Sequence, residues 1–541
     1  MKSGVYDEVM SFAKDYIDTI NALYQLKAND EEEIDAFYKF LKTNLLDTKL
    51  YKPGELIREI QDVAVFNNRY FKSFWTIAKR IFEDYQPKVI ERITPLFDYF
   101  FYKEYGIVFN ETNKKYFNQF EAKNYSIDVH EENSIYKAIM KNDIKSFIIF
   151  TEMDGFDKDQ KYSSNFYPRQ STSYTLIELC CYHGAVDCFK LLRSKFNSKI
   201  THKCLHFSFL SGNPEILNEC LKYEKPCRDC ISYAIISHNI DFVTYLMNEH
   251  NIPIYINCCN DFNNLQTYLI GLEQTNDFNS CFLHRPYFHL PAFYKYILDH
   301  CPDITKKGNF YGRRAFENVI NENRYDIAEI LISHGVDVNI MNDVEESALH
   351  LAAINGRKEL VELFISNGVD VNIKERYNHT PLHYAAKNGN KEIVQLLIDN
   401  GAVVNAKNNQ NITPIHETLN NKNTEALEIL IANGADVNAI TADGYSPLHM
   451  AIYICNSNAA EVLLSHGADI NKTNYLNETA LHIAAKENKI DMVKLLISHG
   501  ADVNIRNYEK KSALDYAVNK NYKEIADILI SHGDVNSNSN V

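Results

Sequence analysis

HTPLHYAAKNGNKEIVQLLIDNGAVVNAK, residues 379–407, is the stretch that decides the fold. Thr380 suits the N-cap of a helix because its hydroxyl can accept a hydrogen bond from an unpaired backbone N–H. Pro381 suits the first helical position, where its missing N–H costs nothing. Gly389 and Gly401 suit left-handed residues that end helices, and the apolar residues between them follow helical spacing: Ile393, Val394, Leu396, Leu397 and Ile398. The stretch therefore predicts two short helices and an extended turn.

The same pattern returns every 33 residues. Glycines keep this interval at Gly335, Gly368, Gly401, Gly434, Gly467, Gly500 and Gly533, and histidines keep it at His350, His383, His416, His449 and His482. Glu317 and Asp515 stand one period before and one period after the histidines. One helical pair is too small to bury its own apolar face, so successive pairs must stack to close a core. Residues 311–541 therefore predict a solenoid of seven units, here called the regular repeats.

The segments TPLHYAAKNG, SPLHMA and TALHIAAKEN resemble ankyrin repeats, which have a 33-residue period and a T-P-L-H-x-A box. The resemblance implies a mostly α fold, an ankyrin-repeat α-solenoid whose units are a helix-turn-helix and a hairpin turn. It also implies that the recurring histidine makes hydrogen bonds between units. The turn tips and the exposed face of the first helix would then form a concave groove that binds other proteins.

Two of the regular repeats depart from this pattern. Lys422 and Cys455 take the place of the glycine after the first helix. Thr418 and Leu419 take the place of the alanine pair in the first helix. Larger residues in these slots predict looser turns or more widely spaced helices.

Residues 129–308 carry weaker copies of the unit, here called the degenerate repeats. TLIELCCYHG (residues 175–184) aligns slot for slot with TPLHYAAKNG, and KCLHFSFLSG (residues 203–212) places His206 in the histidine slot. DCISYAIISH (residues 229–238) fits less well. The short steps between these copies predict shorter connecting turns than in the regular repeats.

Three other segments of this region have their own interpretation. We interpret residues 135–150, IYKAIMKNDIKSFIIF, as a first and strongly degenerate unit. The polar residues 154–173 are expected to form a loop. Residues 252–290 show no clear unit and are expected to be an insertion.

Residues 1–128, here called the head, follow another pattern. Apolar residues at helical spacing predict five helices, with Asp30 and Glu33 as a possible capping box and Pro53 at a helix start. A small helical domain with an aromatic core is therefore expected. The order of head, degenerate repeats and regular repeats resembles the large ankyrin-protein families of protists such as trichomonads. In those families the head is a domain of unknown function.

The composition favours a folded chain without a membrane segment. Hydrophobic residues make up 45% of the 541 residues, which is enough for packed cores. The net charge of -15 disfavours nucleic acid as the main partner, because binding to phosphates needs a surplus of Lys and Arg. The sequence shows neither a long apolar run nor a secretory signal. We expect a cytoplasmic monomer whose partners are proteins, with no nucleic-acid or membrane partner.

The cysteines suggest a possible metal site. Eleven of the twelve cysteines lie within residues 180–301, and Cys227-Arg-Asp-Cys230 has the spacing of a zinc knuckle. Cys258 and Cys259 could complete such a site. Zinc binding, or an enzymatic activity in the N-terminal or cysteine-rich region, is therefore the alternative function.

The repeat register gives a simpler interpretation of the same cysteines, as small buried residues. In this register Cys204 and Cys230 both occupy the slot of Pro381. The histidines form a ladder with one member in each unit and not a cluster, which favours a structural role over metal binding. The sequence contains no H-E-x-x-H, G-x-S-x-G, G-x-G-x-x-G or phosphate-binding loop motif. We therefore expect no enzyme, metal or cofactor.

The candidate binding residues are those that the resemblance places on the groove. The turn tips carry Arg376, Tyr377, His379, Tyr445, Tyr475 and Tyr508. The first-helix face carries Leu351, Tyr384, Met450, Tyr453, Ile483 and Tyr516. Tyr, Met and Arg are enriched at protein interfaces, although a chain with 35 tyrosines also exposes some by abundance alone. The expected function is a scaffold or adaptor that binds partner proteins through this groove.

Overall fold

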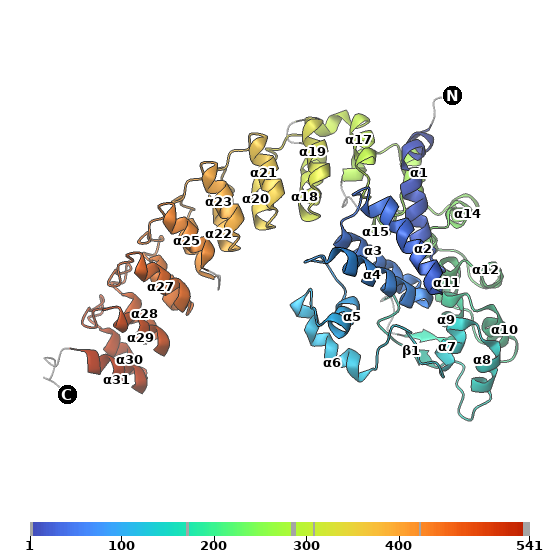
Figure 1. The fold of residues 1–541 in the computed structure, drawn as a ribbon, viewed down its shortest axis with the longest axis horizontal. Helices are drawn as coiled ribbons and strands as arrows, with labels where there is room; N and C mark the ends of the chain where they lie inside the picture. The colour runs from blue at the N-terminus through green and yellow to red at the C-terminus, as the bar shows by residue number, and fades with distance from the viewer. Residues whose placement is uncertain (1–3, 169–172, 283–287, 307–308, 421–423, 534–541) are drawn as a thin grey trace. The chain divides into compact units, whose positions relative to one another are not determined.

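The computed structural model describes residues 4–168, 173–282, 288–306, 309–420 and 424–533. These residues are mostly helical, with one antiparallel pair of strands, β1 (Lys161–Tyr162) and β2 (Tyr174–Thr175). Strand β1 lies in the segment that the sequence predicts to be a loop. Contacts divide the chain into two units, Met1–Ile297 and Leu298–Val541 (Figure 1). The head and the degenerate repeats up to Ile297 therefore share one unit.

The head helices follow the predicted order. They are α1 (Val5–Tyr24), α2 (Glu31–Leu41), α3 (Pro53–Phe66), α4 (Phe71–Tyr85), α5 (Pro95–Tyr105) and α6 (Lys114–Ala122). Between them lie the π-helix η1 (Lys42–Leu46) and the 3-10 helices η2 (Asn68–Tyr70) and η3 (Glu111–Asn113). Pro53 opens α3, and Asp30 caps α2 by accepting the Glu33 N–H at 2.8 Å. The Glu33 carboxylate accepts the N–H of Asn29, one residue before the cap. Helix α6 is an addition to the five predicted helices.

Aromatic side chains fill the core of the head, as expected. The Trp75 ring lies 4.8 Å from that of Phe101, and the Phe71 ring lies 5.5 Å from that of Phe97. Each such pair contributes about 0.5–1.5 kcal/mol beyond the burial of its area. Phe166, which belongs to the degenerate-repeat region, joins this core 4.9 Å from Phe71. The head core therefore continues into the repeats.

The degenerate repeats are five helical pairs among the described residues. They are α7 (Ile135–Lys141) with α8 (Ile144–Thr151), α9 (Leu176–His183) with α10 (Val186–Ser194), α11 (His202–Ser211) with α12 (Pro214–Leu221), α13 (Arg228–Ile236) with α14 (Ile240–His250), and α15 (Ile256–Asp261) with α16 (Leu265–Thr275). The last pair lies where the sequence predicts an insertion, and it packs on α13 and α14 as a further unit. Asn263, at φ +51°, takes the left-handed position that glycine takes elsewhere. The short turn η4 (Asn279–Phe282) follows this pair.

Two first helices of this region begin earlier than the register predicts. Helix α11 starts at His202 with Thr201 as its N-cap, and α13 starts at Arg228 with Cys227 as its N-cap. Cys204 and Cys230 are thus the third helical residues and not residues of the proline slot. The register was aligned on the helix ends, and these two helices have two extra residues at their beginnings.

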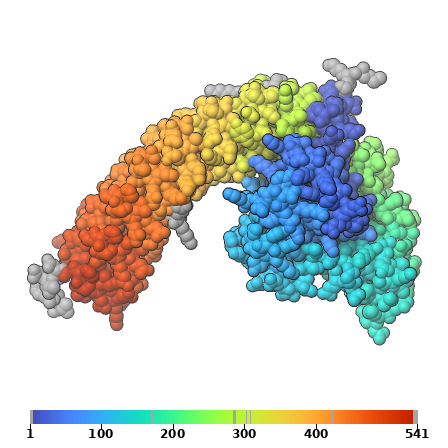
Figure 2. All heavy atoms as spheres, viewed as in Figure 1, coloured from blue at the N-terminus to red at the C-terminus, as the bar shows by residue number. Residues whose placement is uncertain are grey.

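Helix α17 (Pro291–Asp299) crosses the border between the units, and the turn η5 (Pro302–Thr305) follows it. The regular repeats then form seven helical pairs among the described residues: α18 (Phe310–Asn321) with α19 (Tyr325–Ser333), α20 (Ala348–Ile354) with α21 (Lys358–Ser366), α22 (Pro381–Lys387) with α23 (Lys391–Asp399), α24 (Pro414–Glu417) with α25 (Glu425–Ala432), α26 (Pro447–Tyr453) with α27 (Ser457–Ser465), α28 (Ala480–Lys486) with α29 (Ile490–Ser498), and α30 (Ala513–Asn519) with α31 (Lys523–His532). In the first three of these repeats the first helices α18, α20 and α22 lie on the inner side of the curved row, and α19, α21 and α23 lie on the outer side (Figure 1). Figure 2 shows the row, from yellow to red, as a continuous surface of packed side chains.

Asparagine side chains join the turns that follow successive second helices. The Asn372 side chain accepts the N–H of Val403 at 2.7 Å and donates to the carbonyl oxygen of Gly401 at 3.0 Å. Asn405 and Asn438 make the same pair of bonds one and two periods later. These bonds fix each turn to its successor.

The fourth regular repeat is irregular where the sequence departs from the pattern. Helix α24 has four residues and passes into the 3-10 helix η6 (Thr418–Asn420). Thr418 and Leu419 are buried, and the Thr418 hydroxyl donates to the Ile415 carbonyl oxygen at 2.8 Å. Lys422 lies outside the described residues, whereas Cys455 adopts the left-handed conformation at φ +62° in place of glycine. Among the described residues, no helix has both the length and the apolar character needed to cross a bilayer.

Candidate protein-binding surface

The recurring histidines connect successive regular repeats, as expected. The backbone N–H of Thr380 donates to His383 Nδ1 at 3.0 Å, so the ring proton is on Nε2. His383 Nε2 then donates to the carbonyl oxygen of Ile412 in the next repeat at 3.1 Å. Burial lowers the pKa of His383 to about 4, so the ring is neutral at pH 7. The same bonds occur at His350, His449 and His482. Both ring nitrogens are therefore occupied by structural bonds.

A second set of side chains fixes the turn tips, which are residues 343–345, 376–378, 409–411, 442–444, 475–477 and 508–510. The side chain of Asn342, just before the first tip, accepts the N–H groups of Val344 and Glu346 at 3.0 and 2.8 Å. Side chains at the same position organise the following tips: Glu375, Asn408, Thr441, Asn474 and Asn507. The tip backbones are thereby held while most tip side chains stay free to face outward.

Adjacent tips also bond to each other through their backbones. The N–H of Asn409 donates to the carbonyl oxygen of Tyr377 at 3.0 Å, and that of Ala442 donates to Gln410 at 2.7 Å. The N–H of Tyr508 donates to Leu476 at 3.2 Å. These bonds involve peptide groups, so they do not depend on which side chains the tips carry.

The predicted tip residues fall into two groups. Tyr377, Tyr475 and Tyr508 are exposed, with 57%, 59% and 75% of their surface accessible. Arg376 is also exposed, and its guanidinium donates to the Asp343 carbonyl oxygen at 2.7 Å.

The two other predicted tip residues are partly structural. The imidazole of His379 bonds to the Glu375 carboxylate and to the Asn408 amide, both at 2.8 Å. The ring of Tyr445 is half-buried, and it meets that of His449 edge-on with centroids 6.0 Å apart. Both follow the tip and do not belong to it.

The predicted first-helix face is less uniform than expected. Tyr453 is exposed, whereas Tyr384 and Met450 are half-buried. The Tyr516 hydroxyl donates to the Glu478 carboxylate at 3.1 Å, so this side chain also stabilises the turn before it. Leu351 is half-buried. Ile483 is only 4% exposed, because α28 packs between α26 and α30, and it cannot serve as a contact residue.

Two exposed apolar tip residues were missed from the sequence. Leu476 is 55% exposed and Val344 is 41% exposed. Both occupy the middle position of a tip, which is also the position of Tyr377. Reading this position at the 33-residue interval would have found them.

The comparison with known families agrees with this geometry. A family model described as "Ankyrin repeats (3 copies)" matches residues 316–408, 404–474 and 468–539. Residues 316–539 are ankyrin repeats. Ankyrin repeats generally mediate binding to protein partners, which supports a protein-interaction role for this chain.

Two further comparisons were made with solved structures and with curated proteins. Among solved structures the chain is similar to the ankyrin repeat domain of Bcl-3, "a unique member of the IkappaB protein family". The sequences are 25% identical over 40% of this chain and 97% of that one, with a TM-score of 0.36. No curated protein matches this chain.

Outside the ankyrin repeats, a second family model, "Domain of unknown function (DUF3447)", matches residues 196–271. These residues contain the degenerate helical pairs from α11 to most of α16. The match therefore falls on the degenerate repeats and not on residues 1–128, where the resemblance implied a domain of unknown function.

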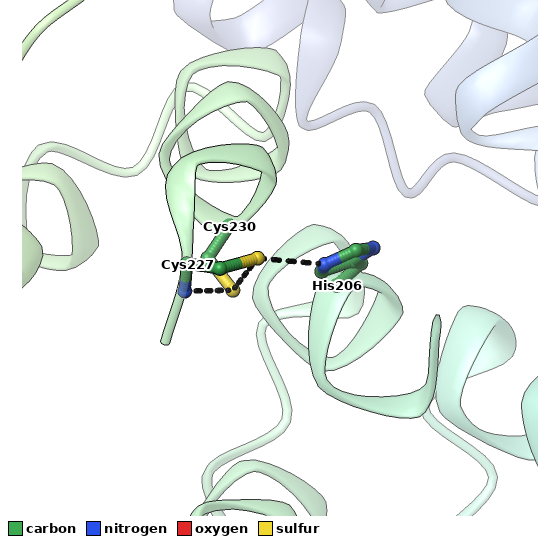
Figure 3. A group of neighbouring side chains, drawn as sticks. All are labelled: His206, Cys227 and Cys230. Carbon is green, nitrogen blue, oxygen red and sulfur yellow. Dashed lines mark hydrogen bonds between the residues drawn. The ribbon is translucent and has the colours of Figure 1, made fainter. Parts of the chain in front are cut away.

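A cluster of metal-ligating side chains lies within this DUF3447 match (Figure 3). His206 Nε2 lies 3.3 Å from Cys227 Sγ, which lies 4.0 Å from Cys230 Sγ. Cys258, a ligand suggested by the sequence, instead directs its thiol to the Ser232 carbonyl oxygen at 3.9 Å. Cys259 is fully buried. The structure thus brings His206, and neither of these cysteines, to the Cys-x-x-Cys pair.

Hydrogen bonds join the side chains of His130, Tyr167 and His183 in an arrangement that resembles a catalytic relay. The Tyr167 hydroxyl lies 2.7 Å from His130 Nε2 and 2.8 Å from His183 Nε2. All three side chains are buried, and burial lowers the pKa of His130 to about 4 and that of His183 well below its usual value. Burial also raises the pKa of Tyr167. Such weak acids and bases are poorly suited to proton transfer near pH 7, so we assign these residues to the core.

Proposed function

We propose that this protein is a non-catalytic scaffold or adaptor that binds partner proteins through the tips and first-helix face of its ankyrin repeats. The observation that carries the proposal is the exposure of large side chains on a hydrogen-bonded tip backbone. Tyr377, Tyr475, Leu476 and Tyr508 are each more than half exposed there. Burying them against a partner would remove apolar surface from water.

The rigidity of the tips supports the same proposal. A tip that is already fixed by Glu375 or Asn474 and by its neighbours loses little conformational entropy when a partner binds. Tyrosine adds contact area with few rotatable bonds and keeps a hydroxyl for a hydrogen bond. Rigid aromatic side chains are the usual centres of binding energy in protein interfaces.

The test is affinity capture of partners by the full chain, followed by quantitative mass spectrometry. Replacing Tyr475 and Tyr508 together by alanine should weaken capture roughly tenfold or more, since two central aromatic contacts are lost. The matched control is Tyr325→Ala, because Tyr325 is exposed at the start of α19, away from the tips. Equal recovery of partners by the double variant and the control would refute this placement of the surface.

A second pair of variants tests the tip geometry without removing a contact residue. A side chain added at Gly444 would come within 2.7 Å of the Tyr475 backbone nitrogen, so Gly444→Ala should displace this tip and reduce capture. Gly467 has the same left-handed conformation but has open space around its Cα. Gly467→Ala should therefore leave capture nearly unchanged. Equal effects of the two substitutions would argue against a role for tip geometry.

The finer parts of the proposal have their own tests. We propose that the working form is a cytoplasmic monomer, which light scattering of the purified chain and imaging of the tagged chain in its own cell would check. We also propose kinship with the trichomonad-type ankyrin families, for which the order of head, degenerate repeats and ankyrin repeats is the support.

A further inference from the structure

Three potential metal ligands from two successive degenerate repeats meet at the start of α13. His206 comes from the middle of α11, Cys227 is the N-cap of α13, and Cys230 is its third residue. Their ligand atoms all lie within 4.8 Å of one another. In Figure 3 the Cys227 thiol points across the gap between the two helices toward the His206 ring.

The spacing of these atoms is close to that of a tetrahedral zinc site. Zinc binds thiolate sulfur at about 2.3 Å and imidazole nitrogen at about 2.0–2.1 Å, which sets S···S and S···N edges of about 3.8 and 3.5 Å. The Cys227–Cys230 edge is 4.0 Å and the His206–Cys227 edge is 3.3 Å. The third edge, from His206 to Cys230, is no longer than 4.8 Å. Small rotations of these side chains would bring all three within reach of one ion.

We propose that His206, Cys227 and Cys230 bind a zinc ion, with the fourth coordination position open to water or an external ligand. Thiolate and imidazole are the ligands that zinc prefers, and a site with three protein ligands keeps water or another small ligand at its fourth position. The ion links α11 to α13 and thereby stabilises two neighbouring degenerate repeats. This site is independent of the partner surface on the ankyrin repeats.

Packing alone does not explain why a cysteine stands at position 227 or why the His206 ring faces it. Helix N-caps are commonly Ser, Thr, Asp or Asn, and the ankyrin repeats use Ser347 and Thr479 at this position. Cys230 Sγ accepts the backbone N–H of Cys227 at 3.4 Å and so helps to cap the helix, but the exposed Cys227 side chain does not fill the core. A role as metal ligand accounts both for a cysteine at the N-cap and for its exposure.

The position of His206 is also unlike that of the ladder histidines. His383 bonds to its own N-cap and to a carbonyl oxygen of the next repeat, whereas His206 Nε2 faces the sulfur of Cys227. The His206 ring is stacked on the Tyr233 ring, with centroids 5.5 Å apart and planes at 15°. This stacking restrains the orientation of the ring whose Nε2 faces Cys227.

The direct test is metal analysis of the full-length chain, loaded with zinc under a thiol reductant and freed of excess metal. We expect about one zinc ion per chain. Cys227→Ser and His206→Asn should each lower the zinc content to near zero. The matched control is Cys258→Ser, which alters a thiol of the same region that lies outside the cluster and should keep its zinc.

Cobalt substitution gives a second readout that does not depend on a variant folding correctly. The wild-type chain, stripped by a chelator and reloaded with cobalt, should show thiolate-to-metal charge-transfer absorption and the visible bands of tetrahedral cobalt. Circular dichroism before and after stripping checks that the chain stays folded. If a variant does not fold, the wild-type spectrum and zinc content decide the question.

Three results would overturn the proposal. One is a wild-type chain that retains no zinc and gives no charge-transfer band. Another is a Cys227→Ser variant that folds and keeps as much zinc as the control. The last is a chain that retains no zinc and has a mass lower by two hydrogens under the same conditions, with Cys227 and Cys230 joined in a disulfide.

Discussion

At the scale of single residues, the ladder histidines depend on being neutral. Burial lowers the pKa of four of them to about 4, whereas a free histidine titrates near 6.5; the four are His350, His383, His416 and His449. Protonation would place a second hydrogen on Nδ1, which must accept the backbone N–H of the N-cap. For His350, His383 and His449, the charge state of the ring therefore controls a bond that joins two repeats.

The ankyrin repeats should accordingly lose stability as the pH falls from 7 to 5. Between pH 6.5 and 4 the unfolded chain binds more protons than the folded one, so the free energy of unfolding decreases as the pH falls. The loss should be on the order of 1 kcal/mol for each histidine by pH 5. Urea unfolding at a series of pH values measures it.

The matched variant is His449→Gln, because glutamine can donate and accept hydrogen bonds but does not titrate. Its stability should fall less steeply over the same pH interval than that of the wild-type chain. Identical slopes for the two chains would show that the ladder histidines do not cause the pH dependence.

Residue roles were predictable to the extent that they repeat. The role of His383 follows from the resemblance, and the structure confirms it through the bond to Ile412. The exposure of Leu476 escaped notice because it stands beside Tyr475, the more conspicuous residue. The meeting of His206 with Cys227 was not predictable, since it depends on where α13 begins, and a shift of two residues places a thiol at the N-cap.

At the scale of helices, the fourth ankyrin repeat is the weak member of the row. Helix α24 ends after Glu417, and the Thr418 hydroxyl bonds to the Ile415 carbonyl oxygen instead of leaving that oxygen for a continuing α-helix. His416 Nε2 has no hydrogen-bond partner among the described residues, unlike its counterpart in His383. The Tyr445 backbone still faces this ring, so the connection to the fifth repeat is weakened at this position and not absent.

Replacing Thr418 by alanine should strengthen this repeat. Alanine restores the small residue of the usual pair and is a better helix former than threonine by about 0.6 kcal/mol. Amide hydrogen exchange of residues 414–420 should slow roughly two- to threefold, while that of α22 should not change. Faster exchange in the variant would mean that the Thr418 hydroxyl bond stabilises the repeat more than a regular helix would.

The sequence predicted the helices well where glycine and proline mark their ends. Pro381 and Gly389 bracket α22 as expected. The pair α15 and α16 was missed because its turn uses Asn263 at φ +51° and neither helix opens with the T-P-L-H box. Asparagine tolerates the left-handed conformation through its short polar side chain, but it is too common in this chain to mark a turn by itself.

At the scale of the whole molecule, the head and the degenerate repeats are joined by a buried polar network. Asn263 accepts the Tyr16 hydroxyl at 2.8 Å and donates to the Tyr51 hydroxyl at 2.5 Å. The Tyr24 ring is stacked on that of His238 with centroids 3.9 Å apart. These pairs lie more than 200 residues apart in sequence, so no local pattern could have predicted that the head packs on the repeats.

Asn263→Ala should therefore destabilise the first unit. The substitution removes the hydrogen bonds of Asn263 to the buried hydroxyls of Tyr16 and Tyr51, at a cost on the order of 2 kcal/mol. The control is Asn276→Ala, at an exposed residue with the same left-handed conformation, which isolates the backbone strain. Hydrogen exchange in α1 and α3 should accelerate in Asn263→Ala and much less in the control. Equal acceleration in both variants would assign the effect to strain.

The backbone hydrogen bonds that join neighbouring tips have a practical consequence. A main-chain hydrogen bond joins Tyr508 to Leu476, and the Asn474 side chain fixes the shape of the tip. The outward side chains of the tip therefore contribute little to the stability of the fold. Their side chains should be interchangeable. A library randomised at residues 475, 476 and 508 should keep the stability of the parent chain while sampling new specificities, so the same frame could be redirected to targets of choice.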